Sequence, residues 1–564
     1  MKKKKLSFIL ALSMLITFIP VTAMAESGGY TDIPADNWSV GVVGAARDYG
    51  LMEGVDDGVF GFGSVITKAQ FIAVLDRMFG WELVSPEIPT LSAVTEDQWF
   101  YPYVETALKH NVIDSAQTFN PEDPITREEM AVMLVKGLGY DSLAQSVASF
   151  GSPFTDVTNN IGYITIARDI GMTKGTGPAT FSPSLTAKRE EAAAMLVRVY
   201  EKYISKTDWV HGFYAISSYS QKEFTENMDA VSVGWSRMSF SADRGAYLNT
   251  TSANSNEYNI PAGYEDIVSY WKENGTKTHL SVYMDTSAKT ETAAGNIDIC
   301  SAILLDGAQR TKAVGAIVNE LTVKYDTIGY NPYSGVTIDF EGMKGSALKE
   351  GFNAFLTELS AALKPLDKTL YVTVQPPSSD GSYYDAYDFR TIGQLADKVI
   401  LMAHDYNGTA MPDHLMGSEY YRNTPVTPFA SVYYALKTIT DENTGVQDPS
   451  KIALAISFSS VGWELEAGKL ISTESVRPAT ATIYTRLAGG AVMGYSDVYR
   501  NPYITYTTEE GKDIFLWYED ERSVKDKIEL ARLFDIKGVS IWRLGIIPDH
   551  SDAGLYYNVM ESIR

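Results

Sequence analysis

The chain of 564 residues contains a single cysteine, Cys300, so no disulfide within the chain can stabilise its fold. The stability must therefore come from buried apolar surface. Positive charge is also scarce, because 47 Lys and Arg residues stand against 70 Asp and Glu residues, which gives a net charge of −23. A surface with this charge repels nucleic acid, and we expect no nucleic-acid partner.

Long apolar runs are missing outside the N-terminus. Lys2 to Lys5 precede an apolar segment, and Ala23-Met24-Ala25 has the small-x-small pattern that signal peptidase recognises. We therefore predict that residues 1–25 are a secretory signal peptide. No later run reaches about 18 uninterrupted apolar residues, so we expect a secreted, soluble protein without a membrane partner.

Residues 28–205 repeat themselves with a period of about 60 residues. An apolar helical pattern in each repeat begins at a polar-basic pair, which follows a phenylalanine at a spacing of seven residues. The phenylalanines are Phe60, Phe119 and Phe181, and the pairs are Thr67-Lys68, Thr126-Arg127 and Lys188-Arg189. A second helix in each repeat is predicted to end at Gly50, Asn111 or Gly171, residue types that tolerate the left-handed C-terminal position. Each repeat is therefore predicted to be a helical hairpin.

These repeats resemble S-layer homology (SLH) repeats, through Tyr30-Thr31-Asp32-Ile33, Phe154-Thr155-Asp156-Val157 and the Thr-Arg-Glu-Glu sequence at 126–129. The resemblance implies three copies, at residues 28–85, 86–145 and 146–205, which bind an acidic, pyruvylated secondary cell-wall polysaccharide. The signature basic residue that contacts this polysaccharide maps to Lys68, Arg127 and Arg189. Lys68 replaces an arginine, Lys188 replaces the threonine cap, and Ala93 stands where an opening aspartate is expected. Helical spacers that bind nothing are the alternative.

From residue 208 onwards, short apolar runs alternate with helical patterns such as 347–363 and 524–534. Eight strands are predicted, at 211–217, 230–235, 278–284, 335–341, 369–375, 398–404, 451–457 and 538–542. Residues 208–564 therefore have the length and alternation of an α/β TIM (β/α)8 barrel that follows the α-helical repeats. The connection from about Tyr484 to Phe515 is predicted to be an insertion that walls one side of a cleft.

The predicted strand at 335–341 carries two acids, Asp339 and Glu341, at its carboxyl end, where the active residues of a barrel lie. Side chains alternate along a strand, so both carboxylates share one face, with Cα atoms about 6 to 7 Å apart. Ionising both is costly in a partly dry pocket, and Glu341 is expected to keep its proton near neutral pH, as a general acid requires. An ion-paired surface edge or a cation site is the alternative reading of this pair.

The segment from Ser334 to Glu341 resembles the signature of glycoside hydrolase family 18, Asp-Gly-x-Asp-x-Asp-x-Glu. Met402-Ala403-His404-Asp405 stands where that family carries Met-x-Tyr-Asp, and Trp542 stands where it places the tryptophan beneath the reactive sugar. Gln375-Pro376-Pro377 and Tyr518-Glu519-Asp520 resemble the branch that acts on spore cortex and bacterial wall glycans.

The resemblance implies a retaining, substrate-assisted hydrolysis of β-linked N-acetylglucosamine glycans such as peptidoglycan or chitin, without a metal or cofactor. Glu341 would protonate the glycosidic oxygen, and Asp339 would orient the 2-acetamido group whose oxygen attacks the anomeric carbon. The expected substrate-binding residues are Gln375, Met402, His404, Asp405, Trp542 and Tyr214. The alternatives are that His404 is a core histidine, Asp405 caps a loop, Met402 fills space and Tyr214 is a packing residue.

Three departures from the signature keep other functions open. Ser334 and Thr337 replace its first two aspartates, so a shifted pH optimum is expected, and His404 replaces a tyrosine. A wall-tethered glycosidase, secreted to the cell wall or S-layer of a Gram-positive type of bacterium, is the first hypothesis. A lectin-like carbohydrate-binding protein on the same barrel and a structural surface-layer subunit are the alternatives.

Overall fold

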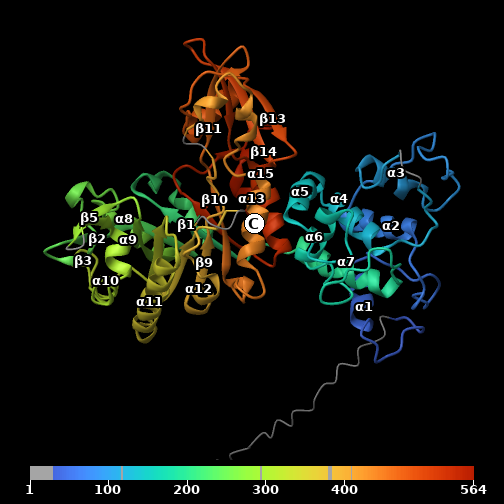
Figure 1. The fold of residues 1–564 in the computed structure, drawn as a ribbon, viewed down its shortest axis with the longest axis horizontal. Helices are drawn as coiled ribbons and strands as arrows, with labels where there is room; N and C mark the ends of the chain where they lie inside the picture. The colour runs from blue at the N-terminus through green and yellow to red at the C-terminus, as the bar shows by residue number, and fades with distance from the viewer. Residues whose placement is uncertain (1–28, 116–118, 293–294, 379–383, 408–409, 564) are drawn as a thin grey trace, which may run out of the picture. The chain divides into compact units, whose positions relative to one another are not determined.

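The computed structural model describes residues 29–115, 119–292, 295–378, 384–407 and 410–563 (Figure 1). The predicted signal peptide lies outside these residues. The described residues form two compact units, one of residues up to 106 together with 119–125 and 186–197, and the other of residues 107–115, 126–185 and those from 198 onwards. Within the described part of the chain, no helix has both the length and the apolar character needed to cross a membrane.

The repeat region is helical, as predicted. Its helices are α1 (Val40–Asp48), α2 (Lys68–Phe79), α3 (Tyr101–Lys109), α4 (Arg127–Gly137), α5 (Asp141–Val147), α6 (Ile161–Asp169) and α7 (Arg189–Tyr203). Thr67 and Thr126 cap α2 and α4, and each forms a capping box with the residue three positions later. Gly50, Asn111 and Gly171 follow helices with φ angles of 70°, 57° and 86°, so the predicted left-handed helix ends are confirmed.

The aspartate of the opening motif holds a turn in the first and third repeats. The Asp32 carboxylate accepts hydrogen bonds from the backbone N–H groups of Phe60, Gly61 and Phe62 at 2.7 to 2.8 Å. Asp156 accepts the equivalent bonds from Phe181 and Ser182 at 2.8 Å. The third repeat therefore has the same local construction as the first.

Eight parallel strands close into a barrel, which confirms the predicted fold class. They are β1 (Trp209–Tyr214), β2 (Ala230–Ser241), β4 (Lys277–Asp285), β7 (Gly335–Glu341), β8 (Thr369–Val374), β9 (Lys398–Leu401), β10 (Ile452–Ser457) and β16 (Gly538–Trp542). Strand β1 pairs in parallel with both β2 and β16, which closes the ring. Strand β9 ends at Leu401, so the predicted strand residues 402–404 belong to the loop after it.

Helices follow most of the barrel strands. They are α8 (Tyr264–Asn274), α9 (Ile299–Leu304), α10 (Gly307–Glu320), α11 (Ser346–Leu363), α12 (Phe389–Leu395), α13 (Phe429–Ile439) and α15 (Glu521–Leu533). The predicted helices at 347–363 and 524–534 are thus confirmed within a few residues. Strand β3 (Gly245–Asn249) pairs antiparallel with the edge of β2. Two small antiparallel pairs are formed by β5 (Lys289–Thr292) with β6 (Gly295–Asp298) and by β17 (Asp549–His550) with β18 (Tyr557–Asn558).

The barrel interior contains a buried chain of neutral polar side chains. The His211 ring hydrogen-bonds Ser540 at 2.8 Å and Ser232 at 2.7 Å, and Ser232 in turn hydrogen-bonds Thr337 at 2.6 Å. Burial lowers the pKa of His279 to about 3 and that of His211 well below its ordinary value, so both imidazoles are uncharged. Thr337 therefore adds a hydroxyl to a neutral network.

An insertion stands out from the barrel between β10 and β16 (Figure 1). Its antiparallel sheet has the order β12-β11-β15-β14-β13. The strands are β11 (Val461–Glu466), β12 (Lys469–Leu470), β13 (Val492–Ser496), β14 (Asn501–Thr507) and β15 (Asp513–Trp517), with α14 (Thr480–Ala488) between β12 and β13. The insertion begins earlier than the predicted Tyr484, because β11 pairs with the distant β15 and buries Trp463 against Phe515 and Trp517.

Candidate active site

Asp339 and Glu341 end strand β7 at the mouth of the barrel. In the parallel register Asp339 lies beside Tyr283 of β4, and Glu341 lies beside Asp285. Asp339 is buried, whereas Glu341 is partly exposed. The alternation of strand side chains places both carboxyl groups on the inner face, as predicted.

Both carboxyl groups hold their protons more tightly than usual. Burial raises the pKa of Glu341 to about 8, and the negative charges of Asp339, Asp285 and Asp405 add to this effect. Burial also raises the pKa of Asp339, to about 6. The two groups titrate together, so near neutral pH the pair holds one proton and one negative charge, the combination that general acid catalysis requires.

Thr373 of β8 is the hydrogen-bond partner of Asp339. Its hydroxyl donates to the Asp339 carboxylate at 2.7 Å inside the barrel, and this bond lowers the pKa of Asp339 against the effect of burial. Ser334 and Thr337 stand at the two signature positions where the family has aspartates. The Ser334 hydroxyl donates to the Thr278 carbonyl at 3.0 Å, and Thr337 belongs to the neutral network. The hydrogen bond to Asp339 thus comes from the neighbouring strand β8 and not from another residue of β7.

The loop after β9 carries His404 and Asp405 as a hydrogen-bonded pair. His404 Nδ1 lies 3.0 Å from Asp405 Oδ2, and the Ser457 hydroxyl donates to the same oxygen at 3.0 Å. Burial works to raise the pKa of Asp405, but the charge of His404 and these hydrogen bonds lower it overall. His404 also lowers the pKa of Asp339, so the two side chains are electrostatically linked.

The other predicted substrate-binding residues lie in different places. The Gln375 side-chain oxygen accepts hydrogen bonds from Gly342 N–H at 2.7 Å and from the Tyr387 hydroxyl at 3.1 Å, so it fixes the turn after Glu341. Trp542 and Met402 are partly exposed and pack against the aromatic cluster inside the barrel. Tyr214 is 3% exposed and packs edge-on against Trp271 of α8, outside the barrel.

Three residues near the acids were not predicted. Tyr258 and Tyr283 stack with ring centres 4.7 Å apart, and the Arg237 guanidinium lies 5.4 Å and 5.0 Å from the two rings. Burial, followed by the charges of Glu257, Asp339 and Glu341, raises the pKa of Tyr258 to about 12, so the ring lies within electrostatic reach of Asp339 and Glu341.

The prediction missed Arg237 because the apolar pattern of β2 ends at Trp235. The strand continues to Ser241, because β3 pairs with its second half. Arg237 is thereby placed beside Tyr283 in the sheet register and 3.4 Å from the Asp285 carboxylate. The sequence does contain a signal for Arg237, which is an isolated basic residue directly after a predicted buried strand.

The signature basic residues of the repeats are packed against the phenylalanines of other repeats. Arg189 is 6% exposed and donates from Nε to the Phe60 carbonyl and from a terminal nitrogen to the Glu53 carbonyl, both at 2.9 Å. Arg127 makes the equivalent bond to the Phe181 carbonyl at 2.9 Å. The Lys68 ammonium lies 5.8 Å from the centre of the Phe119 ring. These contacts join one repeat to another, and the binding of a polysaccharide stays a prediction.

Comparison with known proteins identifies two kinds of domain. Residues 272–546 match the family model of glycosyl hydrolases family 18, and residues 29–72 and 94–131 match that of the S-layer homology domain. The cortical fragment-lytic enzyme of Bacillus anthracis is 24% identical over 252 residues, 44% of this chain and 53% of that protein. The S-layer protein sap of Bacillus anthracis is 27% identical over 210 residues, 36% of this chain and 24% of that protein.

The solved structure of the spore cortex-lytic enzyme SleL from Bacillus cereus aligns with a TM-score of 0.48 at 14% identity, covering 86% of this chain and 97% of that one. The chain spans about half the length of these curated relatives, 56% of a putative sporulation-specific glycosylase of Bacillus subtilis and 53% of the cortical fragment-lytic enzyme. In the described part of the chain, no group of three or more His, Cys, Asp or Glu side chains is arranged to hold a metal ion.

Proposed function

We propose that this chain, which combines a family 18 glycosyl hydrolase domain with S-layer homology domains, is a cell-wall glycoside hydrolase that cleaves β-linked N-acetylglucosamine bonds. The observation that carries the proposal is the pair at the end of β7, where the Asp339 and Glu341 carboxyl groups lie on one face of the strand and burial raises the pKa of both. One acid can then donate a proton while its neighbour stabilises positive charge.

In the first step, the Glu341 carboxyl donates its proton to the glycosidic oxygen, and the bond from that oxygen to the anomeric carbon breaks. The carbonyl oxygen of the substrate's own 2-acetamido group attacks the same carbon and forms an oxazolinium ion. The Glu341 carboxylate then accepts a proton from a water molecule that attacks the anomeric carbon from the vacated side, and the bond from that carbon to the acetamido oxygen breaks, which restores the 2-acetamido group. Two inversions give retention of configuration.

Asp339 has the electrostatic role in this scheme. Its carboxylate lies on the same face as Glu341, where it can accept the acetamido N–H and balance the charge of the oxazolinium ion. The hydroxyl of Thr373 orients it and favours its ionised form, because a hydrogen bond to a carboxylate stabilises the charge. His404, held by Asp405, supplies a nearby donor for the acetamido oxygen.

The substrate is proposed to be a bacterial wall glycan, because the curated relative is named a cortical fragment-lytic enzyme and the repeats match a surface-layer domain. Trp542 at the end of β16 offers an apolar ring for a sugar face. The S-layer homology repeats are proposed to hold the chain on a secondary cell-wall polysaccharide, through Lys68, Arg127 and Arg189. Anchoring would raise the local concentration of the barrel at its substrate without a new catalytic contact. The chain would then act as a secreted protein at the surface of a Gram-positive type of bacterium.

A lectin-like protein is the second candidate, favoured by Thr337, which contributes a neutral hydroxyl where the family signature has an acid. One experiment separates the two candidates. The full chain is incubated with purified peptidoglycan and with chitin oligosaccharides, and new reducing ends are identified by mass spectrometry. Products ending in reducing N-acetylglucosamine, lost in Glu341→Gln and retained in the exposed control Glu350→Gln, support the hydrolase. Binding without product in the unaltered chain supports the lectin.

A further inference from the structure

A concave site lies on the insertion, and none of the residues that line it belongs to a barrel strand. Its cavity volume is about 620 Å³, and we call it the insertion pocket. Its lining comes from strands β11, β14 and β15, from α14 and the loop after it, and from the segment at Tyr421 and Arg422. This volume lies within the range of small-ligand sites, and it suits a ligand of about the size of a tripeptide.

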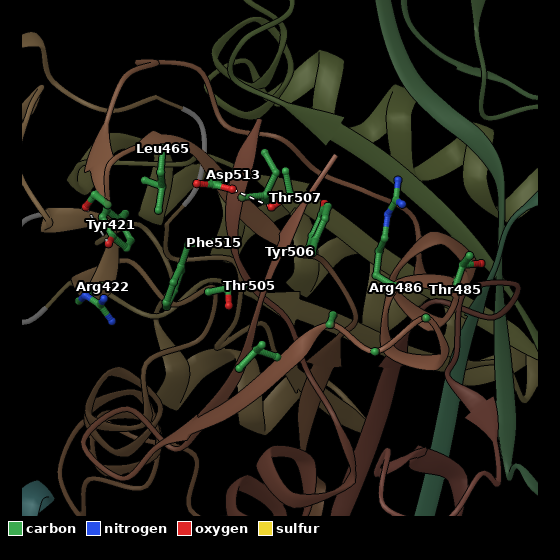
Figure 2. A pocket seen from close by; sticks show the side chains of 16 residues that line it. Tyr421, Arg422, Leu465, Thr485, Arg486, Thr505, Tyr506, Thr507, Asp513 and Phe515 are labelled. Carbon is green, nitrogen blue, oxygen red and sulfur yellow. Dashed lines mark hydrogen bonds between the residues drawn. The ribbon is translucent and has the colours of Figure 1, made fainter. Parts of the chain in front are cut away.

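Two arginines lie on opposite sides of the insertion pocket in Figure 2. The Arg422 guanidinium lies 5.3 Å from the centre of the Tyr421 ring and 5.6 Å from that of Phe515. The Arg486 guanidinium lies 5.1 Å from the centre of the Tyr506 ring. A guanidinium that lies over a ring uses its face for that contact and keeps its in-plane N–H donors for an anion.

The donors of these arginines are not saturated by the protein. Arg486 Nε is buried and has no hydrogen-bond partner among the described residues, which is costly for a charged donor unless a ligand or water supplies one. Among the residues that the structure describes, Arg422 forms one ion pair, to Glu419 at 3.3 Å, in which both side chains are about half exposed. An exposed pair of this kind contributes little, so a ligand carboxylate can compete with it.

The pocket also contains one acid. The Asp513 carboxylate accepts a hydrogen bond from the Thr507 hydroxyl at 2.7 Å and lies on the pocket lining (Figure 2). Two separated cations and one anion complement a ligand that has two or more carboxylates and one ammonium group. A neutral chitin chain offers none of these charges, and a polyuronic acid offers no ammonium group.

We propose that the insertion pocket binds the acidic stem peptide of peptidoglycan, with ligand carboxylates on Arg422 and Arg486 and the ligand amine near Asp513. The charge chemistry is independent of catalysis, and only the choice of a wall peptide as its source rests on the proposed function. The pocket would hold a peptide-bearing strand against the insertion while the barrel mouth acts on its glycan.

The test is calorimetric titration of the full chain with the tripeptide N-acetyl-L-alanyl-γ-D-glutamyl-meso-diaminopimelate, in which the acetyl group replaces the amide link to the glycan and the diaminopimelate amine is the one ammonium group. We expect binding that weakens at least about tenfold in Arg422→Gln and in Arg486→Gln, because each substitution removes a charge-assisted contact. Arg244→Gln is the matched control, since Arg244 is an exposed arginine over the Tyr247 ring at 3.6 Å. Thermal unfolding of each variant confirms that it is folded.

The proposal is overturned if the unaltered chain does not bind the peptide, or if both pocket variants bind it as tightly as the unaltered chain does. An oligomer of galacturonic acid that binds as tightly as the tripeptide overturns the assignment to a peptide. Cleavage of a peptide-free chitin oligosaccharide is measured in parallel and is expected to be equal in all these proteins. If the chain cleaves the oligosaccharide but does not bind the peptide, only the proposal for the insertion pocket fails. If the chain binds the peptide but does not cleave the oligosaccharide, only the proposed hydrolase activity fails.

Discussion

The hydrogen bond from Thr373 to Asp339 gives a quantitative prediction. In Thr373→Val the hydroxyl is replaced by a methyl group of similar size, so the buried carboxylate loses its donor at 2.7 Å while the packing is nearly kept. A hydrogen bond to a charged group contributes about 1.5 to 3 kcal/mol. One pKa unit corresponds to about 1.4 kcal/mol, so the pKa of Asp339 should rise by roughly one to two units.

The sign of the effect on catalysis follows from the protonation states. The proposed mechanism needs Asp339 ionised and Glu341 protonated, so kcat/KM should rise with pH through the pKa of Asp339 and fall through that of Glu341. Burial already raises these pKa values to about 6 and about 8. Loss of the Thr373 hydroxyl raises the lower value, so the acid limb moves to higher pH and the profile narrows.

The assay is the pH dependence of kcat/KM on a chitin oligosaccharide for the unaltered chain, Thr373→Val and Thr373→Ser. The serine variant keeps a hydroxyl and should restore the acid limb to within a few tenths of a unit. If the acid limb of Thr373→Val stays in place or moves to lower pH, then Thr373 does not set the ionisation of Asp339 and the reasoning fails.

The remaining predictions concern activity and stability. Glu341→Gln should lower kcat by at least about a hundredfold, the usual contribution of a general acid. The folded-state pKa of Glu341 is raised, so its ionisation costs stability as the pH rises from about 4.5 through about 8. Calorimetry should therefore find Glu341→Gln more heat-stable than the unaltered chain at pH 9 and not at pH 4. An equal difference in heat stability at both pH values would contradict the raised pKa of Glu341. Arg189→Ala leaves the Phe60 and Glu53 carbonyls without their donor and should lower the unfolding free energy by about 2 to 4 kcal/mol. Urea unfolding checks this against the exposed control Arg47→Ala, expected to cost less than about 1 kcal/mol, and equal costs would refute a structural role for Arg189. The ion pair between Lys527 and Glu519 is buried at 2.7 Å, so Lys527→Ala should cost about 3 to 5 kcal/mol in the same assay. A loss below about 1 kcal/mol would show that Glu519 is neutral or solvated.

Local sequence patterns predicted the parts of the fold that depend on neighbouring residues. Apolar runs located all eight barrel strands, and Thr67 and Thr126 located the starts of two repeat helices. The insertion was underestimated, because β11 is stabilised by pairing with β15 about fifty residues away and has no strong local signal.

The candidate site was predictable only where its residues share a strand. Alternation along β7 placed Asp339 and Glu341 on one face, but Thr373 and Tyr283 reach them through the register of neighbouring strands, which one sequence does not reveal. Tyr214 shows the reverse case. Its neighbour Phe213 belongs to the interior cluster, so alternation alone places Tyr214 on the outer face of the barrel.

The neutral network inside the barrel has a consequence for experiments. His211 and His279 stay uncharged near neutral pH, since burial holds their pKa values well below it. Titration of the unaltered protein between about pH 5 and 9 should therefore leave the charge of these interior side chains nearly constant. A measured pH profile can then be attributed to the groups at the mouth of the barrel, without a correction for protons taken up beneath them.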